Sequence, residues 1–541
     1  MRILFANIGL PIEAPYLNPI HLQTLAGQVA HEFPQADARI VDECANDDSA
    51  RAIEELAPTD ILIAAVSDVV GLDRLLGLVA SRQDALTIAI TGELVTALGP
   101  QGIGERLRQL NKSEIYIFLG REANWLCDFI RSVVSGTPVI APYVFHVRAP
   151  EAILSPLPRD STSGRLLFSH QIVDASRTRG LFLLVEGLTR GCENHCLYCH
   201  LQNHDLTRGV VQHLIPPSGS VVETIRTFGD SCLIFFTDEN FFGGRTRGEI
   251  EDRAEQIASL AREVQEAEVA ALLAVDTRVD SVPLALIQDP SLRSMRKAAW
   301  DALQAAGLIY VYLGIESFSP SQLSRYGKAS EWSSIDLALD EMAARNLAFT
   351  AGLILLDPLG TVDEVEESLN FINSRKLFAR IASPLKVLRV QNASAYARLL
   401  RRRLSFAADA DLSEIDILDL CQDSRMRTVM QRVAPIHSLF AKAGYRHSDS
   451  PAYAAILSRA LGISCPIPEM VGSVECEILS AAIKEKDEEK FNGYSRLRLE
   501  ALVSDVCSWL RSIHEAMGDP RARKVISYYM EVFNLLEARG F

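Results

Sequence analysis

Three cysteines that lie close together are the residues of this sequence with the most evident chemistry. They are Cys192, Cys196 and Cys199 in the stretch GLTRGCENHCLYCH, and their spacing is Cys-x₃-Cys-x₂-Cys. A closed structural zinc site needs four ligands, and His195 or His200 would complete a Cys₃His set. An iron–sulfur cluster held by only three thiolates instead keeps one iron open to a small chelating molecule. No further ligand pair with zinc-finger spacing follows, so the sequence favours the iron–sulfur cluster.

The composition of the chain is that of a large globular protein. Its 541 residues, of which 48% are hydrophobic, indicate about three domains with sizeable cores. The remaining cysteines are scattered among apolar residues, which is typical of buried thiols in a reducing compartment. A net charge of −15 argues against a nucleic-acid partner, because binding to phosphates needs a basic face. We see neither a signal peptide nor an apolar run of roughly 20 residues, so we expect a cytoplasmic protein without a membrane partner.

The elements that must position the cysteines begin with a parallel α/β unit. Apolar runs predict strands, and amphipathic stretches such as 71–82 predict helices between them. Near-continuous apolar strands separated by helices are typical of a parallel sheet covered on both faces. The sequence therefore predicts a doubly wound, Rossmann-like domain over residues 1–140, which would bind ligands at the carboxyl ends of its strands. Its predicted strands span 3–6, 38–41, 61–66, 86–90 and 115–119.

A second alternation of strands and helices follows a Pro/Gly/Ser-rich linker over 141–180. It predicts a partial (β/α)6 TIM-type barrel over 181–405, and the cysteines follow its first strand. Chemistry in barrels sits on the loops at the carboxyl ends of the strands. From 406 to 541 the pattern predicts a C-terminal helical domain. The predicted barrel strands span 181–185, 232–236, 270–275, 309–313, 349–355 and 385–390.

The cysteine motif resembles that of the radical S-adenosylmethionine (radical SAM) superfamily, Cys-x₃-Cys-x-aromatic-Cys, with Tyr198 at the aromatic position. The resemblance implies a four-iron four-sulfur (4Fe-4S) cluster whose open iron takes the amino and carboxylate groups of SAM. It further implies reductive cleavage of SAM to a 5′-deoxyadenosyl radical. An external low-potential electron donor such as flavodoxin or ferredoxin would supply the electron.

Segments at the ends of the later barrel strands resemble the SAM-binding segments of the same family. Asp238 or Glu239 stands where the family holds the SAM amino group, although the segment departs from the family's Gly-Gly-Glu form. Each acid or arginine taken alone could equally well be a surface charge or a helix cap. Because these residues all lie at the ends of successive predicted strands, a role in binding SAM is favoured. By location, the candidates for acid or base are Asp276, Tyr312 and His200. The residues that the resemblance assigns to SAM are Tyr198, Asp238, Glu239, Arg278, Gly314, Glu316, Ser317 and Leu355.

A doubly wound domain ahead of such a barrel resembles the cobalamin-binding branch of the superfamily, the class B-type methyltransferases. The strand-end loops carry this resemblance, and Arg121 replaces the second glycine of the branch's Gly-x-Gly-Glu element. The Asp-x-His-x-x-Gly signature is absent, so the loop 67–72 is expected below the cobalt. A domain that no longer binds a cofactor is the alternative. The residues expected around cobalamin are Pro11, Ser67, Asp68, Val69, Val70, Gly92, Glu93, Gly120, Arg121 and Glu122.

Together these features predict a cobalamin-dependent radical SAM methyltransferase. It would use methylcobalamin and a 5′-deoxyadenosyl radical to methylate a carbon of a small-molecule or peptide substrate. A second hypothesis keeps both cofactors for a radical rearrangement or cyclisation without methyl transfer. A third is a non-catalytic, metal-containing interaction protein.

Overall fold

The computed structural model describes most of the chain, and the gaps concentrate in its first half. The described residues are 1–8, 22, 25–26, 29–30, 32–42, 48–66, 69–82, 84–91, 107, 113–118, 123–137, 144–146, 182–185, 187–190, 192–199, 212–213, 222, 225–226, 233–244, 246–266, 268, 270–328, 331–390, 394–406, 412, 415–513 and 520–539.

The N-terminal part of the chain forms a six-stranded sheet with the order β2-β1-β3-β4-β5-β6. Its first five strands in sequence pair in parallel, as predicted, and β6 joins the edge antiparallel to β5. The sequence did not predict β6, which lies in the presumed linker, because three residues are too few to show an alternation. The strands are β1 (Arg2–Ile8), β2 (Asp37–Asp42), β3 (Ile61–Val66), β4 (Thr87–Thr91), β5 (Glu114–Phe118) and β6 (Val144–His146).

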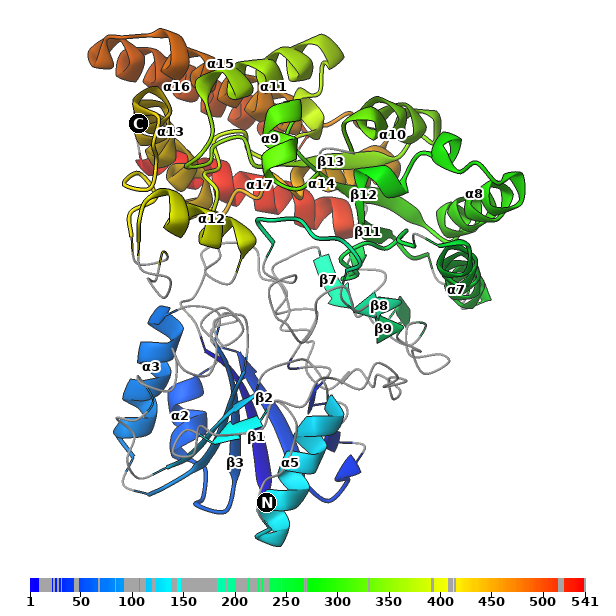
Figure 1. Ribbon diagram of the computed structural model, residues 1–541, viewed down its shortest axis with the longest axis vertical. Helices are drawn as coiled ribbons and strands as arrows, with labels where there is room; N and C mark the ends of the chain where they lie inside the picture. Colours follow the sequence, from blue (N-terminus) through cyan, green and yellow to red (C-terminus); the bar gives the residue numbers. More distant parts are fainter. Residues whose placement is uncertain are drawn as a thin grey trace.

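Helices cover both faces of this sheet (Figure 1). Successive side chains of a strand point to opposite faces, and Phe5 of β1 packs in the core that includes α5 (Ala123–Ser135). Its neighbour Leu4 packs in the other core, with α2 (Ser49–Glu54) and α3 (Val69–Ala80). The sheet is therefore doubly wound, and its strand order reverses between β1 and β3. In such sheets the ligand crevice lies at the carboxyl ends of those two strands.

A second sheet has the order β13-β12-β11-β10-β7, and all of its strands are parallel. Their carboxyl ends meet at one edge, and the intervening helices cover the outside, as in a partial barrel (Figure 1). Its strands are β7 (Phe182–Val185), β10 (Leu233–Phe236), β11 (Leu273–Arg278), β12 (Leu308–Glu316) and β13 (Ala348–Leu353); the helices are α7 (Arg247–Glu266), α8 (Pro290–Ala305), α9 (Pro320–Arg325), α10 (Trp332–Ala344) and α11 (Val362–Arg375). A small hairpin of β8 (Thr189–Arg190) and β9 (Gln212–His213) follows β7.

The sixth barrel strand, predicted over 385–390, does not form as a regular strand. Isolated parallel bridges join Ile381 to Ala351 and Val387 to Leu356, so this segment follows the edge of β13 without a continuous ladder. Pro384 lies between the two bridges, and proline lacks the N–H group that a ladder requires. The observed barrel therefore has five regular strands and an irregular sixth segment.

The C-terminal helices share one apolar core with the barrel strands. The rings of Phe182 on β7 and Tyr453 on α14 lie 5.6 Å apart, and the Tyr310 hydroxyl of β12 donates to the Ser448 carbonyl at 2.5 Å. Tyr528, Tyr529 and Phe533 of the last helix are also buried in this core. The helices of this core are α13 (Ser424–Lys442), α14 (Ser450–Leu461), α15 (Ile467–Lys484), α16 (Glu488–Ile513) and α17 (Pro520–Arg539), whereas α12 (Ala395–Arg403) packs in a separate, smaller core.

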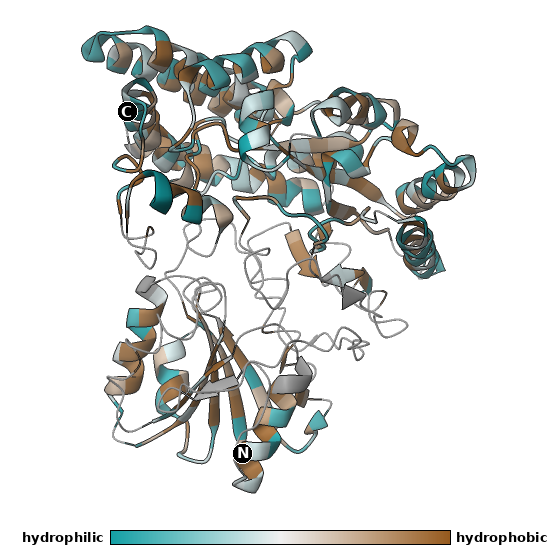
Figure 2. Cartoon of the chain, in the orientation of Figure 1, coloured by the Kyte–Doolittle hydropathy of each residue, from teal (hydrophilic) through white to brown (hydrophobic). Residues whose placement is uncertain are grey.

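Apolar residues gather on the strands and on the inner sides of the helices, while α7 and α8 turn hydrophilic residues outward (Figure 2). None of the helices in the described part of the chain combines the length and apolar character that a membrane span requires.

Candidate functional site

The three cysteines lie between β8 and β9, in the segment that follows β7, and this stretch is called the cysteine loop below. The barrel holds this loop through its backbone. The Leu197 N–H donates to the Tyr326 carbonyl at 2.9 Å, and the Tyr396 N–H donates to the Leu197 carbonyl at 2.8 Å. Gly327, with φ at +75°, lets the two segments approach, because a Cβ there would lie 3.3 Å from the His195 carbonyl oxygen. The loop is therefore fixed by elements far away in the sequence.

The sulfur atoms of this loop receive hydrogen bonds. Asn194 Nδ2 donates to Cys192 Sγ at 3.3 Å, and Arg278 Nη1 donates to Cys196 Sγ at 3.1 Å. Cys196 is buried, while Cys192 and Cys199 are half-buried. Burial raises the pKa of the Cys192 thiol, and the hydrogen bond from Asn194 opposes this effect. Donors aimed at sulfur, on a short loop with three cysteines, fit a cluster held by three thiolates.

Arg278 connects the cysteine loop to a buried set of charges. Its guanidinium group contacts Asp280, with Nε 3.1 Å from Oδ1, and forms an ion pair with the fully buried Glu331. Lys328 Nζ lies 3.2 Å from Glu331 Oε2 and 3.2 Å from Glu316 Oε1. Basic and acidic side chains thus alternate from the cysteine loop to the end of β12. Lys328 and Glu331 were not predicted from the sequence, because neither lies directly at a strand end.

Glu316 ends β12 in an unusual backbone conformation. Its φ of +73° lies in the left-handed region that favours glycine, and the register with β13 shifts at this point. The Tyr198 hydroxyl donates to Glu316 Oε1 at 2.8 Å. Burial, followed by the nearby Glu316 carboxylate, holds the pKa of Tyr198 well above its usual value. Strained backbone of this kind clusters at functional sites, and here it orients the aromatic residue of the cysteine motif.

Asp238 lies fully buried beneath the cysteine loop and does not face open space. Its Oδ1 accepts hydrogen bonds from the Thr189 N–H at 2.7 Å and from the Thr189 hydroxyl at 2.8 Å. Both carboxylate oxygens lie 3.0 Å from the Leu188 nitrogen, and Arg253 Nη1 forms an ion pair with Oδ1 at 3.2 Å. Hydrogen bonds and an ion pair from the protein itself thus engage the carboxylate oxygens, so we assign Asp238 a structural role. Of the predicted pair, the half-buried Glu239 is the one that we retain for SAM.

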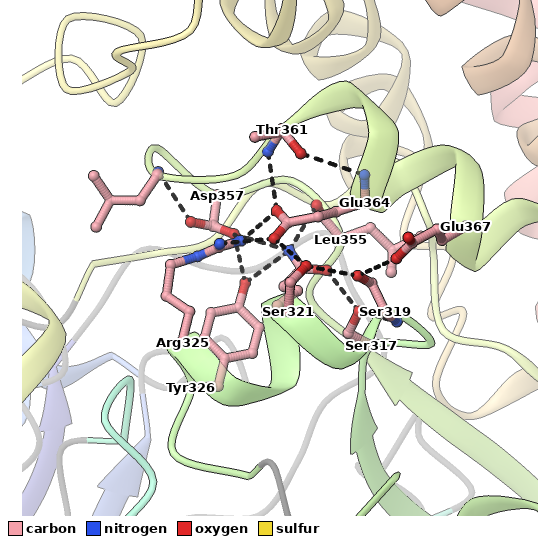
Figure 3. A network of polar contacts seen from close by, with 12 residues as sticks. Ser317, Ser319, Ser321, Arg325, Tyr326, Leu355, Asp357, Thr361, Glu364 and Glu367 are labelled. Atoms are coloured by element: carbon pink, nitrogen blue, oxygen red, sulfur yellow. Dashed lines mark hydrogen bonds and ion pairs between the residues drawn. The ribbon is translucent and has the colours of Figure 1, made fainter.

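Ser317 and Leu355 also belong to an internal network (Figure 3). The Ser317 hydroxyl donates to Gln322 Oε1 at 2.6 Å, and Gln322 Nε2 donates to the Leu355 carbonyl at 3.0 Å. The ion pair of Arg325 Nη2 with Asp357 Oδ2, at 3.0 Å, lies in the same network. These contacts tie the segment after β12 to the segment after β13. Both predicted residues are buried, so they position the neighbouring loops rather than present a side chain.

The two described catalytic candidates lie side by side on β11 and β12. Asp276 is the register partner of Tyr312, whose hydroxyl lies 2.4 Å from where a Cβ on Gly352 would be. Within the described part of the chain, the buried Asp276 Oδ1 has no hydrogen-bond partner. Burial, and then the Glu239 carboxylate, raise the pKa of Asp276 well above its usual value. The geometry therefore presents a carboxyl group that favours its protonated form.

Replacing Asp276 by asparagine is expected to stabilise the protein at neutral pH. Because the folded-state pKa of Asp276 is raised, its contribution to stability is present below about pH 3.8, its unfolded value, and is lost as the pH rises through the folded value. Asparagine does not ionise, so the Asp276→Asn variant does not lose this stability as the pH rises. Its free energy of unfolding should therefore exceed that of the parent protein by more than ~1 kcal/mol at pH 7. The gain should vanish near pH 3.5. Denaturant unfolding at several pH values measures it, and a pH-independent difference would contradict the assignment.

Most residues predicted for cobalamin, together with His200, lie outside the described residues. They are Pro11, Ser67, Asp68, Gly92, Glu93, Gly120, Arg121 and Glu122. Val69 and Val70 begin α3, directly after β3, and only their backbone is described. Pro11 and the loop 67–68 nevertheless follow β1 and β3, the two strands that flank the ligand crevice of this sheet topology.

Known proteins share part of the sequence and the fold of this chain. No protein-family model matches the sequence. The 4′-phospho-dehydrooxetanocin synthase of Priestia megaterium is 25% identical over 208 residues, which cover 37% of this chain and 26% of that enzyme. The structure of the cobalamin-dependent S-adenosylmethionine radical enzyme OxsB, with aqua-cobalamin and S-adenosylmethionine bound, superposes with a TM-score of 0.67 at 14% identity. The superposition covers 98% of this chain and 84% of OxsB.

The fold is that of the cobalamin-dependent radical SAM enzymes. A second neighbour supports this: the radical S-adenosylmethionine methyltransferase TsrM from Kitasatospora setae, with tryptophan and a SAM analogue bound, has a TM-score of 0.56 at 13% identity. That superposition covers 92% of this chain and 99% of TsrM. A further TsrM structure contains cobalamin and a [4Fe-4S] cluster. The predicted α/β fold class is thus confirmed over nearly the whole chain.

Proposed function

We propose that this protein is a cobalamin-dependent radical SAM enzyme that methylates a carbon of a small-molecule or peptide substrate. The observation that carries the proposal is the loop of Cys192, Cys196 and Cys199, fixed at the carboxyl edge of a parallel barrel and supplied with hydrogen bonds to sulfur. The doubly wound sheet ahead of the barrel supports the cobalamin part.

In this proposal the bound cofactors would pass one electron from an external donor to SAM, and would supply a 5′-deoxyadenosyl radical and a transferable methyl group. The chain's own residues would bind and orient these cofactors. The three cysteines hold the cluster, and Arg278 donates to one of its thiolates. Glu316 fixes the phenol of Tyr198 beside the cluster loop, and Glu239 is the acid for the SAM amino group. Asp276 holds a proton inside the barrel, next to Tyr312. A flavodoxin or ferredoxin is the proposed electron donor.

A second function is favoured by the comparisons themselves. The curated relative is named a synthase, and OxsB superposes with a higher TM-score than the methyltransferase TsrM. A radical rearrangement or cyclisation that needs no methyl transfer is therefore the competing proposal. Incubation of the anaerobically reconstituted enzyme with SAM and a reductant separates the two. Methylation predicts S-adenosylhomocysteine together with 5′-deoxyadenosine, whereas 5′-deoxyadenosine alone supports the rearrangement.

Loss of the Arg278 side chain should lower the reduction potential of the cluster. A positive donor to a cluster thiolate favours the reduced, more negative state. Arg278→Met should shift the potential downward by roughly 60–130 mV, the equivalent of one hydrogen bond to a charged group at about 1.5–3 kcal/mol. A redox titration followed by electron paramagnetic resonance measures the shift. Arg262→Met, at an exposed position of α7, is the control, and an upward shift in Arg278→Met would refute this role.

Replacement of Glu316 should weaken SAM binding without removing the cluster. Glu316→Ala deletes the acceptor of the Tyr198 hydroxyl and one partner of Lys328. Two lost contacts to a charged group should raise the Kd for SAM about 10–100-fold. Equilibrium dialysis of the anaerobic, iron-loaded protein measures this, and Glu255→Ala on the exposed side of α7 is the control. If the Kd is unchanged, Tyr198 does not contact SAM through this pair.

A further inference from the structure

A group of metal-ligating side chains, of which one is fully buried and two are half-buried, lies among the C-terminal helices, outside the cysteine loop. It comprises His437 of α13, His447 ahead of α14 and Glu475 of α15. One ligand atom from each residue lies within 4.8 Å of the other two. The three residues come from consecutive helical segments, and the packing of these segments brings them together.

The polar atoms of this group are incompletely satisfied. Glu475 is fully buried, and its Oε2 has no hydrogen-bond partner among the described residues. His447 Nε2 lies 2.8 Å from Glu475 Oε1, yet the same part of the structure shows no hydrogen bond to this nitrogen. A buried carboxylate is costly unless a cation or hydrogen-bond donors compensate its charge. No lysine or arginine forms an ion pair with Glu475 within the described ranges.

The surroundings hold the side chains in place. Ser383, which follows the 3-10 helix η7 (Phe378–Arg380), has its hydroxyl 2.9 Å from Glu475 Oε1 and 3.2 Å from His437 Nδ1. The ring of Tyr445 packs against that of His447 with centroids 4.6 Å apart. A hydroxyl that orients ligand side chains and an apolar shell are both typical of the second layer of a metal site.

The chemistry of the group suits one class of ion. Two imidazoles and one carboxylate form the His₂Glu set that binds zinc, with a fourth position left for water or another oxygen. A neutral imidazole nitrogen is a common ligand of this metal.

We propose that His437, His447 and Glu475 bind a zinc ion that fastens the C-terminal helices to the barrel. The ion neutralises the buried Glu475 carboxylate and ties α13 and α15 to the segment around Ser383, which runs beside β13. The site is independent of the proposed cluster and of the proposed reaction. The ion would link elements that pack in one core.

Zinc binding is tested on the full chain with Cys192, Cys196 and Cys199 replaced by alanine, so that the cluster loop cannot bind the metal. After chelation and dialysis against zinc chloride, mass spectrometry should find about one zinc per chain. Titration with Co²⁺ should give the visible absorption of a tetrahedral site. Zinc should also raise the thermal midpoint, since it binds the folded state.

His437→Gln and Glu475→Gln should each weaken zinc binding by more than ~100-fold and remove the thermal shift. The matched control is Glu477→Gln on the same helix, where Glu477 pairs with Arg498 at 2.7 Å. It should bind zinc as the parent does. Absence of zinc from the parent, or equal zinc in the parent and both ligand variants, would overturn the site. The Co²⁺ spectrum reports coordination directly, so a variant of lowered stability still gives a clear result.

Discussion

Cys199→Ala is expected to purify without a 4Fe-4S cluster and to form no 5′-deoxyadenosine from SAM. After anaerobic reconstitution the parent protein should bind about four irons per chain. The variant should retain less than about one iron per chain, because a cluster held by three thiolates needs all three of them. SAM cleavage should fall by more than ~10³-fold, since the reaction depends on the cofactor. Iron analysis and chromatography of the nucleoside product measure the two effects.

The matched control for this loss is Cys465→Ala. Cys465 is a free cysteine outside the loop, just ahead of α15, and its removal should leave iron content and SAM cleavage unchanged. A Cys199→Ala protein that keeps its full iron content would mean that another side chain completes the site. Such a result would return His195 to consideration as a ligand.

Asp238→Ala should destabilise the protein by about 3–5 kcal/mol, because it leaves the Arg253 guanidinium buried and unpaired. Arg253 has only 5% side-chain exposure, and its partner Asp238 has 0%. The change also removes the acceptor for the Leu188 and Thr189 N–H groups, on which the start of the cysteine loop depends. Denaturant unfolding measured by circular dichroism quantifies the loss.

An exposed ion pair provides the contrast to this buried pair. Lys297 pairs with Asp301 at 2.6 Å and has 61% side-chain exposure, so Lys297→Ala should cost no more than about 1 kcal/mol. Asp238→Asn, which keeps an acceptor oxygen, should fall between the two. If Asp238→Ala is as stable as Lys297→Ala but loses SAM affinity, Asp238 is a SAM ligand and the structural assignment fails.

Periodicity predicted the strands of the first sheet more closely than those of the second, where β11 and β12 extend three residues beyond the predicted ends at 275 and 313. The strand predicted over 61–66 matches β3, and the boundaries of β1, β2, β4 and β5 differ by no more than two residues, because buried parallel strands are continuous apolar runs. The exceptions have local causes. Strand β6 is too short to show a pattern, and Pro384 interrupts the sixth barrel segment.

The sequence also located the cysteine loop, Arg278 and Glu316 at strand ends, but it did not distinguish acids that face a ligand from acids that bind the protein. Asp238 and Glu239 are neighbours with the same chemistry, and contacts made only in the folded chain, with Arg253 on α7 and with Thr189, mark Asp238 as structural. That pair, like the approach of His447 to Glu475, depends on tertiary packing. A single sequence carries no signal for such contacts unless the partners share a local motif.

The central claim is that the three-cysteine loop holds a 4Fe-4S cluster with one iron left for SAM. Mössbauer spectroscopy of the anaerobic, ⁵⁷Fe-loaded protein tests it most directly. Added SAM should change the Mössbauer signal of one iron out of about four and leave the signals of the other irons unchanged. An unchanged spectrum in the presence of SAM, or zinc in place of iron at Cys192, Cys196 and Cys199, would contradict it.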